Sequence, residues 1–172
     1  MSIQTQMKQE LQSKELFKQV VSYAFEYMDG VNSMDVFPSQ ENLNQLSVFD
    51  ESLPQESSTA EELIKQLHQF GSPATIAQTG GRYFGFVNGG AIPASLGVKW
   101  LSDVWDQCAG LYLTSPINAK LESVCETWLK DIFNLPSETV AGFVSGTSMA
   151  NLCGLLAARF QLLQNLGWDI SK

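Results

Sequence analysis

The residues with the clearest chemical potential form a turn of small, hydroxyl-bearing side chains, Ser145-Gly146-Thr147-Ser148. An apolar run precedes this turn, and a helical pattern follows it over residues 148–166. The first turn of a helix offers unpaired backbone N–H groups and the positive end of the helix dipole, and the hydroxyls add further donors. Residues of these types in this order are typical of a phosphate-binding site.

Two other interpretations fit the same turn. Small residues between a strand and a helix can simply permit close packing. Gly146-Thr147-Ser148-Met149-Ala150 also matches a variant of the nucleophile elbow of α/β-hydrolases. In those enzymes the catalytic histidine follows the serine, whereas the single histidine here, His68, precedes Ser148. A serine hydrolase using Ser148 is therefore the less favoured alternative. The chain carries neither a P-loop nor a dinucleotide-binding motif.

Apolar residues at helical spacing predict the elements that must position this turn. Helices are expected over residues 13–28 and 58–71, the second opened by a capping box of Ser58 and Glu61. Two further helices are expected to begin at Pro93 and at Pro116, because proline is favoured in the first helical turn.

Residues 140–144 are apolar on both faces, which predicts one short strand of the kind found inside a parallel sheet. The sequence supplies no convincing partner for this strand, and unpaired backbone groups are costly to bury. The helix after it is apolar around most of its circumference, which predicts burial. We therefore expect a predominantly helical, truncated chain, whose missing sheet belongs to a longer enzyme or to another polypeptide.

Composition excludes several classes of partner. A formal net charge of −8, with the basic residues scattered, argues against nucleic acid. No apolar run approaches the roughly 20 residues that cross a bilayer, and no secretory signal pattern is visible. Three widely spaced cysteines beside apolar neighbours are expected to be buried, reduced thiols of a cytoplasmic protein. Neither they nor the single histidine have metal-ligand spacing, so no metal site is expected.

Several motifs, taken in order, resemble the group II pyridoxal-phosphate-dependent amino-acid decarboxylases, which include the aromatic-L-amino-acid and glutamate decarboxylases. The resemblance extends from about Ser13 to the C-terminus. The motifs that carry it are Gly85-Phe86-Val87-Asn88-Gly89-Gly90-Ala91-Ile92-Pro93, Thr114-Ser115-Pro116 with Leu121-Glu122, Trp128-Leu129, and Gly142-Phe143-Val144-Ser145-Gly146-Thr147-Ser148-Met149-Ala150-Asn151.

This resemblance implies an α/β protein of fold type I that forms an obligate homodimer. Residues 1–80, with an irregular linker over 31–56, match the N-terminal helical segment. Residues 81–172 match the start of the large cofactor-binding domain. Thr147 and Ser148 match the turn that binds the phosphate of pyridoxal 5'-phosphate. Phe86, Asn88 and Gly89 match a loop that contacts the small-molecule amino-acid substrate.

The resemblance also implies what this stretch lacks. The family's Schiff-base lysine, its ring-stacking histidine and the aspartate that pairs with the ring nitrogen all match positions beyond Lys172. No catalytic residue is therefore expected in this chain, and the polypeptide alone is expected not to decarboxylate amino acids. The matched motifs leave open whether the substrate is aromatic, acidic or another amino acid. A non-enzymatic alternative is a helical fragment that dimerises through an apolar surface.

Overall fold

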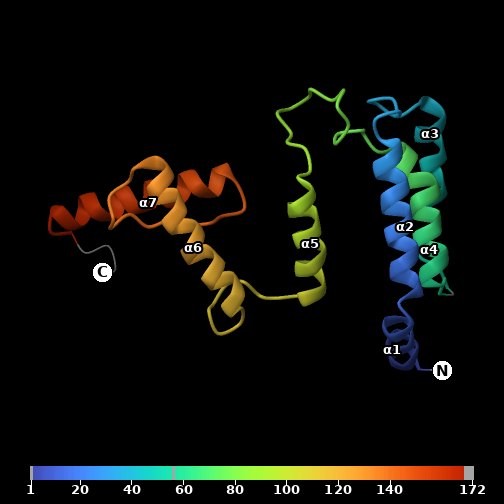
Figure 1. Cartoon of the computed structure of the whole chain (residues 1–172), viewed down its shortest axis with the longest axis horizontal. Helices are drawn as coiled ribbons and strands as arrows, with labels where there is room; N and C mark the ends of the chain where they lie inside the picture. Colours follow the sequence, from blue (N-terminus) through green and yellow to red (C-terminus); the bar gives the residue numbers. More distant parts are fainter. Residues whose placement is uncertain (1, 56, 169–172) are drawn as a thin grey trace. The chain divides into compact units, whose positions relative to one another are not determined.

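The computed structural model describes residues 2–55 and 57–168, which form helices joined by loops (Figure 1). The chain divides into two compact units, Met1–Gly97 and Val98–Lys172. The domain boundary between residues 80 and 81 rests on the family resemblance and stays a prediction. Glu56 and residues 169–172, which end two of the predicted segments, lie outside the described residues.

The first unit begins with two consecutive helices, α1 (Ile3–Ser13) and α2 (Glu15–Gly30). They meet at Lys14, whose backbone is left-handed with a φ of 60°. The helix predicted over residues 13–28 corresponds to α2, which ends two residues later than predicted, whereas α1 was not predicted. The Ser2 side chain caps α1 by accepting a hydrogen bond from a backbone N–H of its first turn.

The linker after α2 is more regular than predicted. Helix α3 (Gln40–Gln45) lies within it, followed by a 3₁₀ turn over Leu46–Phe49. The Asn42 side chain donates a hydrogen bond of 3.2 Å to the carbonyl of Pro73. This bond ties the linker to the chain that follows the next helix.

Helix α4 (Ala60–Gln66) begins with a capping box, one residue later than predicted. Thr59 and Glu62 form it, in place of Ser58 and Glu61: the Thr59 hydroxyl accepts from the Glu62 N–H, and the Glu62 carboxylate accepts from the Thr59 N–H. The helix continues as a π-helical turn to Gly71, where the sequence predicts its end. It packs against α2, as Figure 1 shows.

A small buried cluster holds the chain that leads out of this helical group. Val31 and Ala77 are buried apolar side chains of this cluster. The Ala77 N–H donates to the carbonyl of Val36, and the Gly81 N–H donates to the Asn32 side chain. These bonds fix residues 77–81 against the loop after α2, immediately before the predicted substrate loop.

The remaining helices begin close to where proline and the apolar period predict. They are α5 (Pro93–Trp105), α6 (Pro116–Phe133) and α7 (Thr147–Asn165). The boundary between the two units falls within α5. Helix α6 ends at Asn134, which is left-handed with a φ of 49° and reverses the chain before Pro136.

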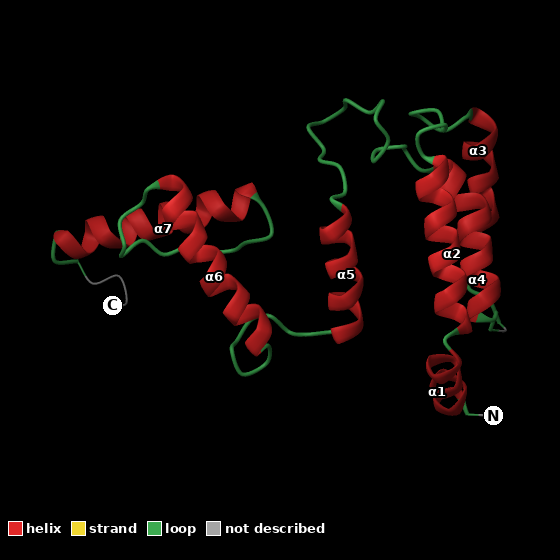
Figure 2. Cartoon of the chain, viewed as in Figure 1, coloured by secondary structure: helices red, strands yellow, loops and turns green. Residues whose placement is uncertain are grey.

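The predicted strand over residues 140–144 is wrong. These residues form a loop, and Figure 2 shows helices and loops but no strand over the described chain. A strand needs a neighbour whose backbone groups complete its hydrogen bonds. Over this stretch the described residues supply no backbone partner, and the N–H of Ala141 donates to a side-chain carboxylate instead. The apolar pattern signals a segment suited to a sheet that the described residues do not contain.

The predicted burial of α7 and of the cysteines is also wrong for the chain as described. Leu155 is 70% exposed and Phe160 is 50% exposed. All three thiols are free, with Cys108 and Cys153 exposed and Cys125 half-buried. An apolar pattern indicates that a helix is suited to burial against other residues. It does not indicate whether those residues belong to the same part of the chain. Over the described residues, no helix has the length and apolar character required to span a bilayer.

Candidate functional site

Thr147 and Ser148 are the first two residues of α7, which begins one residue before the start at Ser148 that the sequence predicts. Gly146 precedes them in extended conformation and provides no side-chain cap. The first helical hydrogen bond runs from the N–H of Ala150 to the carbonyl of Gly146. Within the described part of the chain, the N–H groups of Thr147, Ser148 and Met149 and the two hydroxyls have no hydrogen-bond partner.

This helix start has the chemistry that a phosphate requires. It combines backbone donors, two hydroxyls and the positive end of a 19-residue helix. Its first turn carries no acidic side chain that would repel an anion. Gly146, Thr147 and Ser148 are all exposed, so the approach to the donors is open. The residues present therefore fit a phosphate group.

The predicted substrate residues lie together on one exposed loop after residue 83. Phe86 is 92% exposed, and no neighbour crowds Gly89. Phe86 and Val87 have left-handed backbones with φ values of 54° and 57°. This conformation is unfavourable for non-glycine residues and a true outlier for β-branched valine. Backbone strain of this kind is enriched at binding sites.

Asn88 is the best-anchored residue of this loop. Its side-chain amide donates a hydrogen bond of 3.2 Å to the phenol oxygen of Tyr83. Asn88 belongs to the first unit, whereas Thr147 and Ser148 belong to the second. Phe86, Asn88 and Gly89, the predicted substrate residues, therefore lie together in one unit. Thr147 and Ser148, the predicted cofactor residues, lie together in the other, and the two subsites are described separately.

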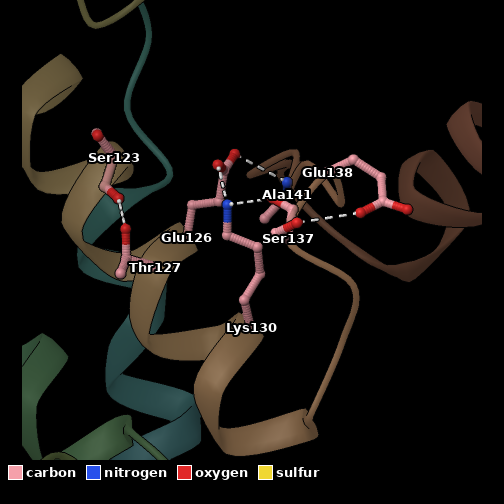
Figure 3. A network of polar contacts seen from close by, with 7 residues as sticks. All are labelled: Ser123, Glu126, Thr127, Lys130, Ser137, Glu138 and Ala141. Atoms are coloured by element: carbon pink, nitrogen blue, oxygen red, sulfur yellow. Dashed lines mark hydrogen bonds and ion pairs between the residues drawn. The ribbon is translucent and has the colours of Figure 1, made fainter.

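A polar network that the sequence analysis missed lies just before the turn that carries Thr147 and Ser148 (Figure 3). The Glu126 carboxylate accepts hydrogen bonds from the N–H of Ala141 and from the ammonium of Lys130, each 3.1 Å long. These bonds, the Ala141 one first, hold the pKa of Glu126 below its ordinary value. The spacing of Glu126 and Lys130 on one helix was a visible signal, but nothing in the sequence indicated Ala141.

The single histidine, His68, is partly buried within the first unit. The His68 ring stacks on Tyr23, with centroids 4.0 Å apart and planes 10° from parallel. Its Nδ1 lies 3.0 Å from the Ser72 hydroxyl and its Nε2 lies 3.3 Å from the Glu26 carboxylate. Both ring nitrogens are therefore engaged within the first unit, which counts against a role for His68 as a base for Ser148.

The described residues contain no group of three or more histidine, cysteine, aspartate or glutamate side chains arranged to hold a metal ion. The donors gathered at the start of α7 are N–H and O–H groups, which bind anions. These donors are therefore suited to an anion, as the predicted cofactor phosphate would be.

Comparison with known proteins identifies the family. Residues 41–168 match the pyridoxal-dependent decarboxylase conserved domain, which is more than half of the chain. The chain belongs to the pyridoxal-dependent decarboxylase family, and pyridoxal phosphate is the cofactor that this family implies.

Individual relatives agree with this assignment. The chain is 28% identical over 159 residues to the aromatic-L-amino-acid decarboxylase of Mus musculus, covering 87% of this chain and 33% of that protein. A tryptophan decarboxylase of Camptotheca acuminata is 26% identical over 157 residues, covering 88% of this chain and 32% of the relative. An L-tyrosine/L-DOPA decarboxylase of Lophophora williamsii is 25% identical over 166 residues, covering 91% of this chain and 32% of that protein. The chain thus spans about a third of the length of these relatives.

Proposed function

We propose that the chain is the N-terminal portion of a pyridoxal-phosphate-dependent decarboxylase of aromatic L-amino acids. The observation that carries this proposal is the open donor set of Thr147 and Ser148, inside the stretch that matches the family. The relatives named above, which act on aromatic amino acids, support the substrate class. The exposed ring of Phe86 offers a surface on which an aromatic side chain can stack.

In this proposal the residues of the chain bind and orient. The N–H groups and hydroxyls of Thr147 and Ser148 donate hydrogen bonds to the cofactor phosphate, which the helix dipole also favours. Asn88, held by Tyr83, and Gly89 line the substrate side. When bound, the cofactor supplies an electron-withdrawing ring that stabilises the carbanion left as CO₂ departs.

The polypeptide by itself is proposed to lack decarboxylase activity. His68 is stacked on Tyr23 and bonded to Glu26 and Ser72, so it is not free to stack on a cofactor ring. Mass spectrometry after borohydride reduction tests this proposal. We expect no single lysine to be stoichiometrically modified by pyridoxal 5'-phosphate. A uniquely modified lysine, together with CO₂ release, would contradict it.

Self-association with a second copy is the proposed partner interaction. Large apolar side chains of α7 are exposed, and exposed apolar patches mark association surfaces. This surface also fits the non-enzymatic alternative of a dimerising helical chain. Sedimentation velocity distinguishes a dimer from a monomer, and a monomer at high concentration would contradict both versions. A cytoplasmic location is proposed on the three free thiols.

The phosphate seat is tested by comparing pyridoxal 5'-phosphate with pyridoxal, which lacks the phosphate. We expect the 172-residue chain to prefer the phosphorylated form in equilibrium dialysis. S148A should lower that preference on the order of tenfold, because a hydrogen bond to a charged group is lost. The matched control is S95A, which removes an exposed serine from the first turn of α5. Equal affinity of the unmodified chain for both compounds would overturn the assignment.

A further inference from the structure

Helix α6 is bonded directly to the loop that delivers the start of α7. Glu126 lies in the middle of α6, and its carboxylate accepts from the Ala141 N–H across fifteen residues of sequence. Ala141 is half-buried. A half-buried N–H that loses its acceptor is destabilising, so this bond has a consequence that an exposed contact would not have.

Lys130 fixes the other end of the same loop. Its ammonium lies 3.1 Å from the Glu126 carboxylate and 3.3 Å from the carbonyl of Ser137. The side chains of Glu126 and Lys130 are only 28% and 22% exposed, in contrast to the other lysine–carboxylate pairs described. One turn of α6 therefore holds both ends of residues 137–141, as Figure 3 shows.

Holding Ala141 restricts where α7 can begin. Five residues separate Ala141 from Thr147. Such a stretch reaches at most about 20 Å, and less when it is not fully extended. Cβ atoms placed on Gly142 and Gly146 would meet nothing within 4 Å, so those residues add no restraint of their own. The bond at Ala141 is therefore the last hydrogen bond described between α6 and the chain before the phosphate-binding turn. Phe143, two residues later, lines a hollow beside Leu121 and Cys125 of α6 and keeps this stretch near the same helix.

We propose that Glu126 is a positioning residue for the cofactor phosphate, acting through the Ala141 N–H on the turn that carries Thr147 and Ser148. This inference rests on the proposed function of those two residues. The ion pair with Lys130 is not the essential part, because a pair four residues apart on a helix stabilises weakly. The essential part is the acceptor that Glu126 presents to Ala141.

The test uses three variants and two readouts. E126A removes the acceptor, E126Q keeps a neutral acceptor, and E126K/K130E keeps an ion pair but presents an ammonium to the Ala141 N–H. The first readout is amide hydrogen exchange at Ala141 and the first turn of α7, without cofactor. The second is the ratio of affinities for pyridoxal 5'-phosphate and pyridoxal. The control is E15Q, which removes the exposed Glu15–Lys18 pair of α2.

Loss of one hydrogen bond predicts a threefold to tenfold change, on the order seen for single bonds in proteins. E126A should speed exchange at Ala141 and lower the affinity ratio by about that factor, while pyridoxal alone binds as before. E126Q should lower the affinity ratio less than E126A does. E126K/K130E should not recover the affinity ratio of the unmodified chain. E15Q should change neither readout. If E126A folds poorly, E126Q and the cofactor-free exchange measurement still test whether Glu126 positions the turn.

Three results would overturn the inference. If S148A lowers the ratio and E126A does not, Thr147 and Ser148 bind the phosphate without help from Glu126. If E126K/K130E restores the ratio, the ion pair rather than the Ala141 bond is responsible. If S148A itself has no effect, the phosphate seat fails and the positioning role fails with it, and the exchange readout then reports only a structural bond.

Discussion

The phenol oxygen of Tyr83 accepts a hydrogen bond from the side-chain amide of Asn88, five residues along the chain. Tyr83 reaches Asn88 by folding over Gly85, where a Cβ atom would lie 2.8 Å from the phenol oxygen. The glycine therefore permits a close approach, and a side chain at this position would require the Tyr83 phenol to move. The loop proposed to contact the substrate is thus held by a bond within its own sequence.

Removing that bond should loosen the loop without unfolding the unit. For Y83F we expect amide exchange over residues 85–90 to rise by about twofold to tenfold, because one exposed hydrogen bond is lost. Exchange in α2 and α4 should not change. G85A should disrupt the same bond by crowding Tyr83, so the double variant should be little worse than either single variant. Fully additive effects would show that the two changes act separately.

The strained backbone at Val87 makes a second prediction. Asparagine tolerates the left-handed region better than valine, whose side chain branches at Cβ. V87N should stabilise the loop by up to about 1 kcal/mol, measured as slower chymotrypsin cleavage after Phe86. The matched control is V140N, which makes the same change at an exposed valine outside the left-handed region. Equal effects of the two variants would contradict the role of strain.

The capping box of α4 should be essential to that helix. T59A removes the hydroxyl that caps the Glu62 N–H and should destabilise α4 by about 1 kcal/mol. Amide exchange resolved along α4 is the measurement. E61Q is the control, because Glu61 occupies the same first turn without sharing in the capping box. A larger effect of E61Q than of T59A would favour the capping box predicted from the sequence.

The same box predicts a pH dependence for α4. Hydrogen bonds from the Thr59 hydroxyl and backbone lower the pKa of Glu62 below its ordinary value of 4.5. Because the folded pKa is the lower one, this contribution to stability is complete above pH 4.5 and is lost as the pH falls through the folded pKa. Protection factors along α4, which correct for the intrinsic pH dependence of amide exchange, should therefore fall on acidification below that point. E62Q should remove this part of the pH dependence.

The packing of α2 on α4 should depend on the ring of His68 rather than on its charge. H68A removes the stack on Tyr23 and should lower the free energy of unfolding of this unit by about 1 kcal/mol. H68F keeps an aromatic ring and should recover most of the loss. E26Q should cost less than about 0.5 kcal/mol, because the Glu26 side chain is 72% exposed. Chemical denaturation measures all three, and a dominant effect of E26Q would reverse the conclusion.

The helices were predictable where local chemistry determines them. Proline at Pro93 and Pro116 marks the starts of α5 and α6, and the apolar period extends them to their ends. Helix α1 escaped prediction because its apolar residues are few and its start rests on a single Ser2 cap. The strand over residues 140–144 failed for another reason, since a strand depends on a partner that its own pattern cannot supply.

The residues of the candidate site also differ in whether the sequence alone could predict them. Thr147 and Ser148 could be found from sequence because a helix start and its hydroxyls are local features. The bond between Glu126 and Ala141 could not, because nothing local states which backbone N–H a carboxylate will reach. The Tyr83–Asn88 bond lies between these cases, because Gly85 could be read from the sequence whereas the geometry of the hydrogen bond could not.

The left-handed backbone of Lys14 breaks the helical hydrogen-bond ladder between α1 and α2 at a single exposed residue. Proteases bind their substrates in extended form, so a break of this kind is easier to engage than either helix beside it. Trypsin would be expected to cut more readily after Lys14 than after Lys8 or Lys18, which lie inside α1 and α2, and so to release α1 while α2 stays packed on α4.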